Sequence, residues 1–312
     1  MLKWCIVLLW TIISLNSCSY TPSANESQYY TFKQRLVPLY DQIIIRGAIN
    51  VRLYTDSKHP RLALRGDAHD LQHIHPRIIG HALFIEYDKT YTQHGIINVE
   101  IHAPNLHVFK YFGAGTIEGR GLHTRGLRLY IKNSGPTILN GQINLQCLVV
   151  TGTGSLKING LSAYNLQIIM RGSPAVMLHG NSINLGKLIL CGKGNLTIYK
   201  VQNNRIVVRE HGEVKLLLAG NANVLDLELW NKARFNGRYL TVRRAFVKTR
   251  DHSIAGINVV KVQHTLASDA SDIYFYNLPD FKNDFMSHNG AVLDMRTWES
   301  MGIHAYTPYN KH

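Results

Sequence analysis

Residues 148–158 read LVVTGTGSLKI, and residues 188–198 read LILCGKGNLTI. In both stretches, apolar residues alternate with other residues on each side of a Gly-x-Gly triplet. Alternation with a period of two is typical of a strand that buries one face, and glycines between two such runs favour a tight corner. We therefore interpret each stretch as strand, corner and strand. A phosphate-binding loop is the alternative for each triplet, but that loop requires a helix after the glycines.

The same arrangement recurs about every twenty residues. A small residue ends each apolar run, at Gly115, Gly135, Gly154, Gly172, Gly194, Gly212, Ala233, Ser253, Ser271 and Gly290. Short runs of this kind cannot bury their apolar faces alone, whereas stacked coils share a continuous core. The sequence therefore predicts an all-β fold, a single-stranded β-solenoid (β-helix) with coils of about 20 residues.

The solenoid domain is expected to span residues 31–298. Residues 40–103 have less regular spacing, and we interpret them as the first coils with capping elaborations. Residues 281–297 resemble a final coil, and residues 299–312 are the predicted C-terminal cap or tail. A cover is expected there because an unpaired terminal strand invites edge-to-edge aggregation.

The amino terminus predicts export. Residues 1–17 have the basic start, apolar middle and small or polar end of a signal peptide. Residues 15–18 (LNSC) resemble the bacterial lipobox, which predicts cleavage before Cys18 and lipidation of that cysteine. The acyl chains would anchor the protein in a membrane, with residues 18–30 as a tether. By resemblance to bacterial lipoprotein sorting, Ser19 favours the outer membrane, facing the periplasm or the cell surface. An ordinary signal peptide with an incidental cysteine is the alternative.

The chain is strongly basic. Its 34 Lys and Arg against 20 Asp and Glu give a formal net charge of +14. Besides the membrane itself, we expect an anionic partner such as an acidic polysaccharide or lipopolysaccharide, or else a surface protein. We expect no nucleic-acid partner, because no basic run exceeds Arg243-Arg244 and no nucleic-acid-binding motif is present. A basic surface that is merely solvated is the alternative.

No catalytic residue is expected. The chain has no Gly-x-Ser-x-Gly motif, and Cys147 and Cys191 lie within strand-like runs. The repeat register places the two cysteines at different positions around the coil, so we expect two free thiols; a disulfide between them is the alternative. Asp226 and Glu228 share one face of a strand, and a glycosidase would need two such carboxylates. The repeat register places basic residues of neighbouring coils beside both. We therefore interpret them as charge ladders between coils.

The repeat register also aligns Arg209, Trp230 and Arg250 of three successive coils. A column of cations and an aromatic ring can stack as an external cation–π ladder. It is the candidate ligand-facing ladder of this chain, although structural stacking alone also explains it.

One cluster is the candidate for metal ligation: His69, His73, His75 and His81, together with Asp67 and Asp70. Its His-x-His pair would share one face of a strand. However, 16 histidines are spread through the whole chain. We therefore expect no metal site, and no cofactor.

Three segments resemble the bacterial family called "putative auto-transporter adhesin, head GIN domain". They are residues 43–53 (IIIRGAINVRL), residues 62–67 (LALRGD) and residues 149–156 (VVTGTGSL). The resemblance covers residues 36–295 and rests on pattern, without a catalytic motif. It implies an exported β-solenoid with an adhesive or envelope role.

Together these features predict a non-enzymatic cell-envelope lipoprotein that presents a basic β-solenoid surface for adhesion or envelope interaction. A β-helix enzyme or binding protein acting on acidic polysaccharide is the alternative. A scaffold that binds only its own copies is a third hypothesis, which the sequence does not separate from the first.

Overall fold

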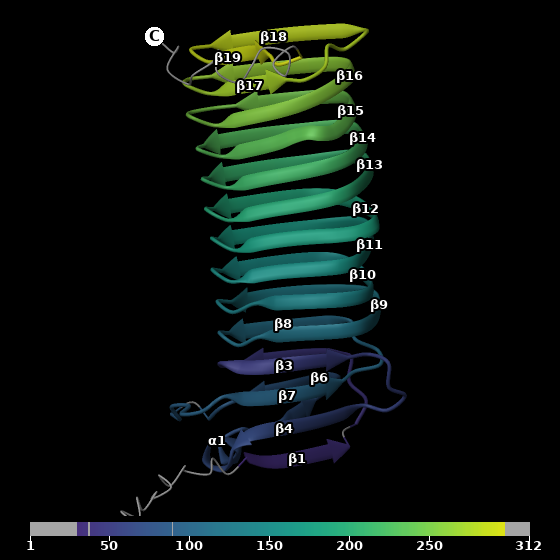
Figure 1. Ribbon diagram of the computed structural model, residues 1–312, viewed down its shortest axis with the longest axis vertical. Coiled ribbons are helices and arrows are strands. Elements are labelled where there is room, and N and C mark those ends of the chain that lie inside the picture. Colours follow the sequence, from purple (N-terminus) through teal and green to yellow (C-terminus); the bar gives the residue numbers. More distant parts are fainter. Residues whose placement is uncertain (1–29, 37, 89, 297–312) are drawn as a thin grey trace, which may run out of the picture.

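The computed structural model describes residues 30–36, 38–88 and 90–296 (Figure 1). Strands account for 74% of the structure and helix for 2%, and the strands form a β-solenoid of about nine turns with coils about 20 residues apart. The predicted fold class is confirmed. The predicted signal peptide, Cys18, the tether up to residue 29 and the predicted C-terminal tail lie outside the described residues.

Eight long strands form the regular part of the solenoid. They are β9 (Ile117–Asn133), β10 (Thr137–Gly152), β11 (Ser155–Gly172), β12 (Ala175–Gly192), β13 (Asn195–Gly212), β14 (Lys215–Asn231), β15 (Arg234–Thr249) and β16 (Ile254–Ser268). Each strand bends around about one coil and pairs in parallel with the next, so the coils stack directly on one another (Figure 1).

Apolar columns fill the interior, because every second residue of a strand points inward. One column runs from β10 to β15, and none of its members is more than 1% exposed: Leu148, Ile168, Leu188, Val208, Leu227 and Val247. Each coil therefore buries its apolar face against the coil below and the coil above. This shared burial is the main stabilising contribution in a solenoid.

A column of glycines forms the corner after each coil. Gly152, Gly172, Gly192 and Gly212 are aligned from coil to coil, with φ between +85° and +111°. A Cβ on Gly172 would lie 2.6 Å from the carbonyl oxygen of Gly152. Glycine is therefore required both for the positive φ and for the close stacking. Asn231 continues the column, with φ +64°. The predicted corner glycines Gly152 and Gly192 are confirmed.

The first coils are not stacked in chain order. The elements concerned are β2 (Gln42–Arg46), β3 (Ile49–Tyr54), β6 (Ala82–Glu86), β7 (Ile97–His102) and β8 (Val108–Gly113). β2 pairs with β6 and β8, while β3 pairs with β7 and β9. The coil made of β2 and β3 therefore lies between two coils that come later in the chain (Figure 1). The spacing of residues does not predict this order.

Antiparallel strands cover the amino-terminal end of the stack. β4 (Arg61–Asp67) pairs with β7, and β1 (Tyr30–Leu36) pairs with β4. The helix α1 (Ala68–Gln72) and the short strand β5 (Arg77–Ile79) connect β4 to β6.

At the carboxy-terminal end, short strands complete the last coil. β17 (Asp272–Phe275) and β18 (Lys282–His288) pair with β16, and β19 (Ala291–Asp294) pairs with β17. Among the described residues, no helix combines the length and hydrophobicity needed to cross a membrane.

Candidate binding surface

One outer face of the solenoid carries two grooves. We call it the grooved face and define it by a column of outward side chains that are aligned from β3 to β17: Arg52, Glu118, Ile138, Lys157, Met177, Thr197, Leu217, Asn236, Gly256 and Tyr274. Neighbouring members are about one strand spacing, roughly 4.8 Å, apart. The face is thus continuous along the solenoid, with one groove near each end.

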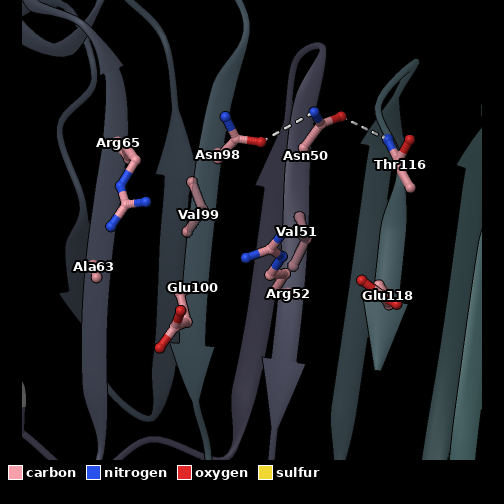
Figure 2. Close-up of a pocket in the computed structure, with 10 residues that line it drawn as sticks. All are labelled: Asn50, Val51, Arg52, Ala63, Arg65, Asn98, Val99, Glu100, Thr116 and Glu118. Carbon is pink, nitrogen blue, oxygen red and sulfur yellow. Dashed lines mark hydrogen bonds between the residues drawn. The ribbon is translucent and has the colours of Figure 1, made fainter. Parts of the chain in front are cut away.

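The N-terminal groove has a volume of about 410 Å³ (Figure 2). Side chains from β3, β4, β7 and β9, with Thr116 before β9, line it. Its floor has a polar ladder across the strands. The Asn50 side-chain amide donates to Oδ1 of Asn98 at 3.2 Å, and Oδ1 of Asn50 accepts from the Thr116 backbone N–H at 2.9 Å.

Charged residues of alternating sign lie below this amide ladder. Arg52 is aligned with Glu100 on one side and with Glu118 on the other. Each carboxylate, however, pairs along its own strand: Glu118 accepts from Nε of Arg120 at 2.8 Å, and Glu100 lies 2.9 Å from Nε2 of His102. Arg52 is exposed and has no ion pair among the residues that the structure describes. The groove therefore offers an exposed cation between two occupied carboxylates.

The C-terminal groove, of about 600 Å³, spans β13 to β17. Cationic, aromatic and amide side chains line it: Lys215, Arg234, Arg238, Tyr239, Tyr274, Tyr276, Asn195 and Asn236. None of these residues was singled out from the sequence. Gly256 was the available signal, because it is a residue without a side chain at an outward position between Asn236 and Tyr274.

The predicted ladder of Arg209, Trp230 and Arg250 is aligned differently in the structure. Trp230 is opposite His211, and their rings stack at 4.2 Å with an angle of 2°. Arg209 is opposite Glu228. The difference arises because Asn231, rather than Ala233, is aligned with the corner residue Gly212. The sequence register took Ala233 as the corner, and it was therefore wrong by two residues in β14. Trp230 and Arg250 do line a common hollow of about 80 Å³. Its use by a ligand remains a prediction.

The predicted charge ladder between coils is confirmed. Asp226 pairs with Arg205 at 3.1 Å and with Arg209 at 3.0 Å, and Glu228 is aligned with Lys248. Burial alone would raise the pKa of Asp226, but the hydrogen bonds from the two arginines outweigh burial and lower the pKa. Asp226 is thus held as a structural ion.

Two members of the predicted histidine cluster, His69 and His73, contact Tyr91, whereas His75 lies 3.4 Å from Asp88. His73 stacks on Tyr91 at 3.9 Å, and Nδ1 of His69 lies 3.0 Å from the Tyr91 hydroxyl. That hydroxyl donates to Asp70, whose side chain is fully buried and also accepts the backbone N–H groups of His94 and Gly95. Burial and the hydrogen bond to Asp70 raise the pKa of Tyr91 to about 12. No group of three potential ligands in the described part of the chain has the geometry of a metal site.

Two further residues concern possible reactivity. Cys147 and Cys191 are free thiols, as predicted. They lie in different columns, since Cys147 is aligned with Gln167, whereas Cys191 is aligned with Arg171. Glu210, which the sequence did not single out, is fully buried in the core, and neither carboxylate oxygen has a hydrogen-bond partner among the residues that the structure describes. Burial raises its pKa well above the usual range.

The family profile described as "Putative auto-transporter adhesin, head GIN domain" matches residues 39–212. The chain belongs to this family. The GIN-domain match runs from β2 to β13 and includes the N-terminal groove, while the C-terminal groove extends beyond it. The resemblance predicted from the three sequence segments is confirmed. The family description is consistent with a non-enzymatic adhesive role and with an exported or surface protein.

Solved structures match the chain at low sequence identity. A "putative lipid binding protein" from Parabacteroides distasonis is 13% identical, with a TM-score of 0.48 over 85% of this chain and 96% of its own. A "putative adhesin" from the same species is 12% identical, with a TM-score of 0.49 over 86% and 98%. Another, from Parabacteroides merdae, is 13% identical, with a TM-score of 0.48 over 85% and 95%. No curated protein matches the chain.

Proposed function

We propose that this GIN-domain protein is a non-enzymatic cell-envelope lipoprotein that is anchored at Cys18 and presents its grooved face to an anionic partner. The observation that carries the proposal is the continuity of that face, which passes through coil after coil without a deep pocket. Solenoids use such extended surfaces for binding. The partner class is an acidic polysaccharide, lipopolysaccharide or a surface protein.

Charge supports this choice of partner. The chain has a net charge of +14. The grooved face bears the exposed cations Arg52, Lys157, Lys215 and Arg234, none of which has an ion pair among the described residues. Unpaired cations along one face attract anionic polymers and speed their association.

The membrane address is tested by metabolic labelling with a tagged fatty acid. The full-length protein should carry the label and fractionate with the outer membrane. If it faces outward, protease added to intact cells should degrade it. Cys18→Ala should lose the label, whereas the matched control Cys147→Ala should keep it. An unlabelled wild-type protein in the soluble fraction would refute the anchor.

An enzyme acting on acidic polysaccharide is the second candidate. It is favoured by one observation, the alignment of Glu100 and Glu118 on either side of Arg52 in the N-terminal groove. Glycosidases need two carboxylates across a substrate site. Purified protein is incubated with polygalacturonate, and new reducing ends or unsaturated products are measured. Turnover that Glu118→Gln abolishes would establish the enzyme, whereas binding without product supports the adhesive role.

A further inference from the structure

The lining of the C-terminal groove includes a residue without a side chain, Gly256. Along the grooved face, Leu217, Asn236, Gly256 and Tyr274 are aligned on successive coils. Gly256 leaves a gap between two larger residues, and an added Cβ there would lie 3.3 Å from the Tyr276 ring. The φ of Gly256 is not in the left-handed region. Backbone conformation therefore does not require glycine here, and a larger residue at this position would press on the Tyr276 ring that borders the groove.

Tyrosine rings border this gap on two strands. Tyr239 of β15 is 62% exposed, and Tyr274 and Tyr276 are partly exposed. The Arg238 guanidinium lies 5.0 Å from the centre of the Tyr276 ring and 5.8 Å from that of Tyr239. One cation thus contacts both rings and restricts their orientation. Ring faces held in this way suit stacking against the C–H face of a sugar.

The other half of the groove is cationic. Lys215 and Arg234 are aligned on adjacent strands, both exposed, and neither has an ion pair within the described part of the chain. No Asp or Glu lines the groove. The nearest carboxylate in register, Asp272, is 3% exposed and accepts a hydrogen bond from the Tyr274 hydroxyl at 3.3 Å. The exposed charge of the groove is therefore positive.

We propose that this groove binds an acidic oligosaccharide that lies along the solenoid axis. Lys215 and Arg234 contact its acidic groups, Tyr239 and Tyr276 stack on sugar rings, and the Asn236 amide bonds to hydroxyls. The groove extends over four strand spacings, about 19 Å, which gives room for several sugar units. This proposal rests on the proposed adhesive function and names its ligand class and site.

A carbohydrate fits the lining better than a nucleic acid does. Single-stranded nucleic acid needs a basic track along its backbone with aromatic rings between the charges. Here the cations Lys215, Arg234 and Arg238 lie on β14 and β15 only, so no basic track runs the whole length of the groove from β13 to β17. Amides and phenol hydroxyls supply both donors and acceptors for sugar hydroxyls.

Calorimetry on the purified full-length chain in detergent tests the site. The probes are an oligogalacturonide for carboxylate, a sulfated dextran oligosaccharide for sulfate, neutral dextran and a thymidine oligonucleotide. We expect binding to one or both acidic sugars, about tenfold weaker in Lys215→Gln or Arg234→Gln. Gly256→Val, which adds a side chain to the groove lining without changing charge, should abolish binding. Lys187→Gln and Tyr164→Ala are the matched controls on exposed residues outside the groove and outside the column that defines the grooved face, and circular dichroism verifies folding of each variant.

The outcomes separate the site from the general function. If the wild type binds acidic sugars and the groove variants bind equally well, the groove assignment is wrong and the adhesive function stands. If neutral dextran or the oligonucleotide binds more tightly than either acidic sugar, the proposed ligand class is wrong. If the wild type binds neither these probes nor isolated cell envelopes, the adhesive function itself is refuted.

Discussion

Glu210 is an ionisable residue in the apolar core. In an interior column, Glu210 is aligned with Leu190 of the preceding coil and with Leu229 of the following coil. A carboxylate without a partner in such a core is costly, so the folded protein holds Glu210 in its neutral form. The unfolded chain would release that proton at an ordinary pH.

Stability should therefore fall as pH rises above the ordinary carboxyl pKa, because the folded state binds more protons than the unfolded state. Glu210→Gln should remove this pH dependence. Glu210→Leu should raise the free energy of unfolding by roughly 2 kcal/mol near neutral pH, and by more in base. Urea unfolding at several pH values measures both effects. Glu213→Gln, at an exposed corner, is the control and should match the wild type; a wild-type curve that is flat between acid and neutral pH would contradict the argument.

At the scale of one strand and its neighbours, ion pairs between β13 and β14 fix the outer side of the coils. Arg209 pairs with Asp226 and with Glu228, at 3.0 and 3.3 Å. All three side chains are at least 70% buried, so these pairs are screened less than ordinary surface pairs. They complement the apolar columns on the inner side of the same strands.

Asp226→Asn should lower the free energy of unfolding by about 1 kcal/mol near neutral pH. The pKa of Asp226 is lowered in the folded state, so its contribution is present above the unfolded pKa and is lost as pH falls through the folded pKa. The wild type and the variant should thus converge in acid. Thermal melts across the acid range check this convergence, and Glu213→Gln again serves as the exposed control.

Local sequence patterns predicted the strands of the solenoid, but they did not predict the exact register between strands of neighbouring coils. Alternation of apolar residues identifies strands because it depends only on near neighbours in sequence. The register of β14 was misjudged because Asn231 takes the corner conformation that glycine has elsewhere. The gap at Gly256 and the isolation of Glu210 depend on what other coils place beside them. Such relations between distant residues cannot be read from one repeat.

For the whole molecule, each coil contacts only the coils next to it. A defect in one coil should therefore weaken its neighbours and leave distant coils intact. The same reasoning explains why the order of the first coils was not predicted. β2 and β3 pair with residues that follow them by 40 to 66 positions, and no periodicity in the sequence indicates such pairing.

Leu188→Ala should test this nearest-neighbour behaviour. Leu188 is fully buried in the central column, and its truncation should cost about 3 kcal/mol. Hydrogen exchange measured by mass spectrometry should show lost protection in β11, β12 and β13, with β16 unchanged. Met177→Ala, on the outer side of the same strand and 42% exposed, is the control. Uniform loss of protection over all coils would show that the solenoid unfolds as one unit instead.

The displaced coil near the amino terminus has a mechanical consequence. A pulling force applied at Tyr30 first strips β1 from β4, since β1 has β4 as its only strand partner among the described residues. The load then reaches β2, which is hydrogen-bonded along both edges, to β6 and to β8. Extracting that strand breaks two ladders at once, whereas peeling an end coil breaks only one. The solenoid thus has a force-resistant clamp close to the end from which a tethered rod would be pulled.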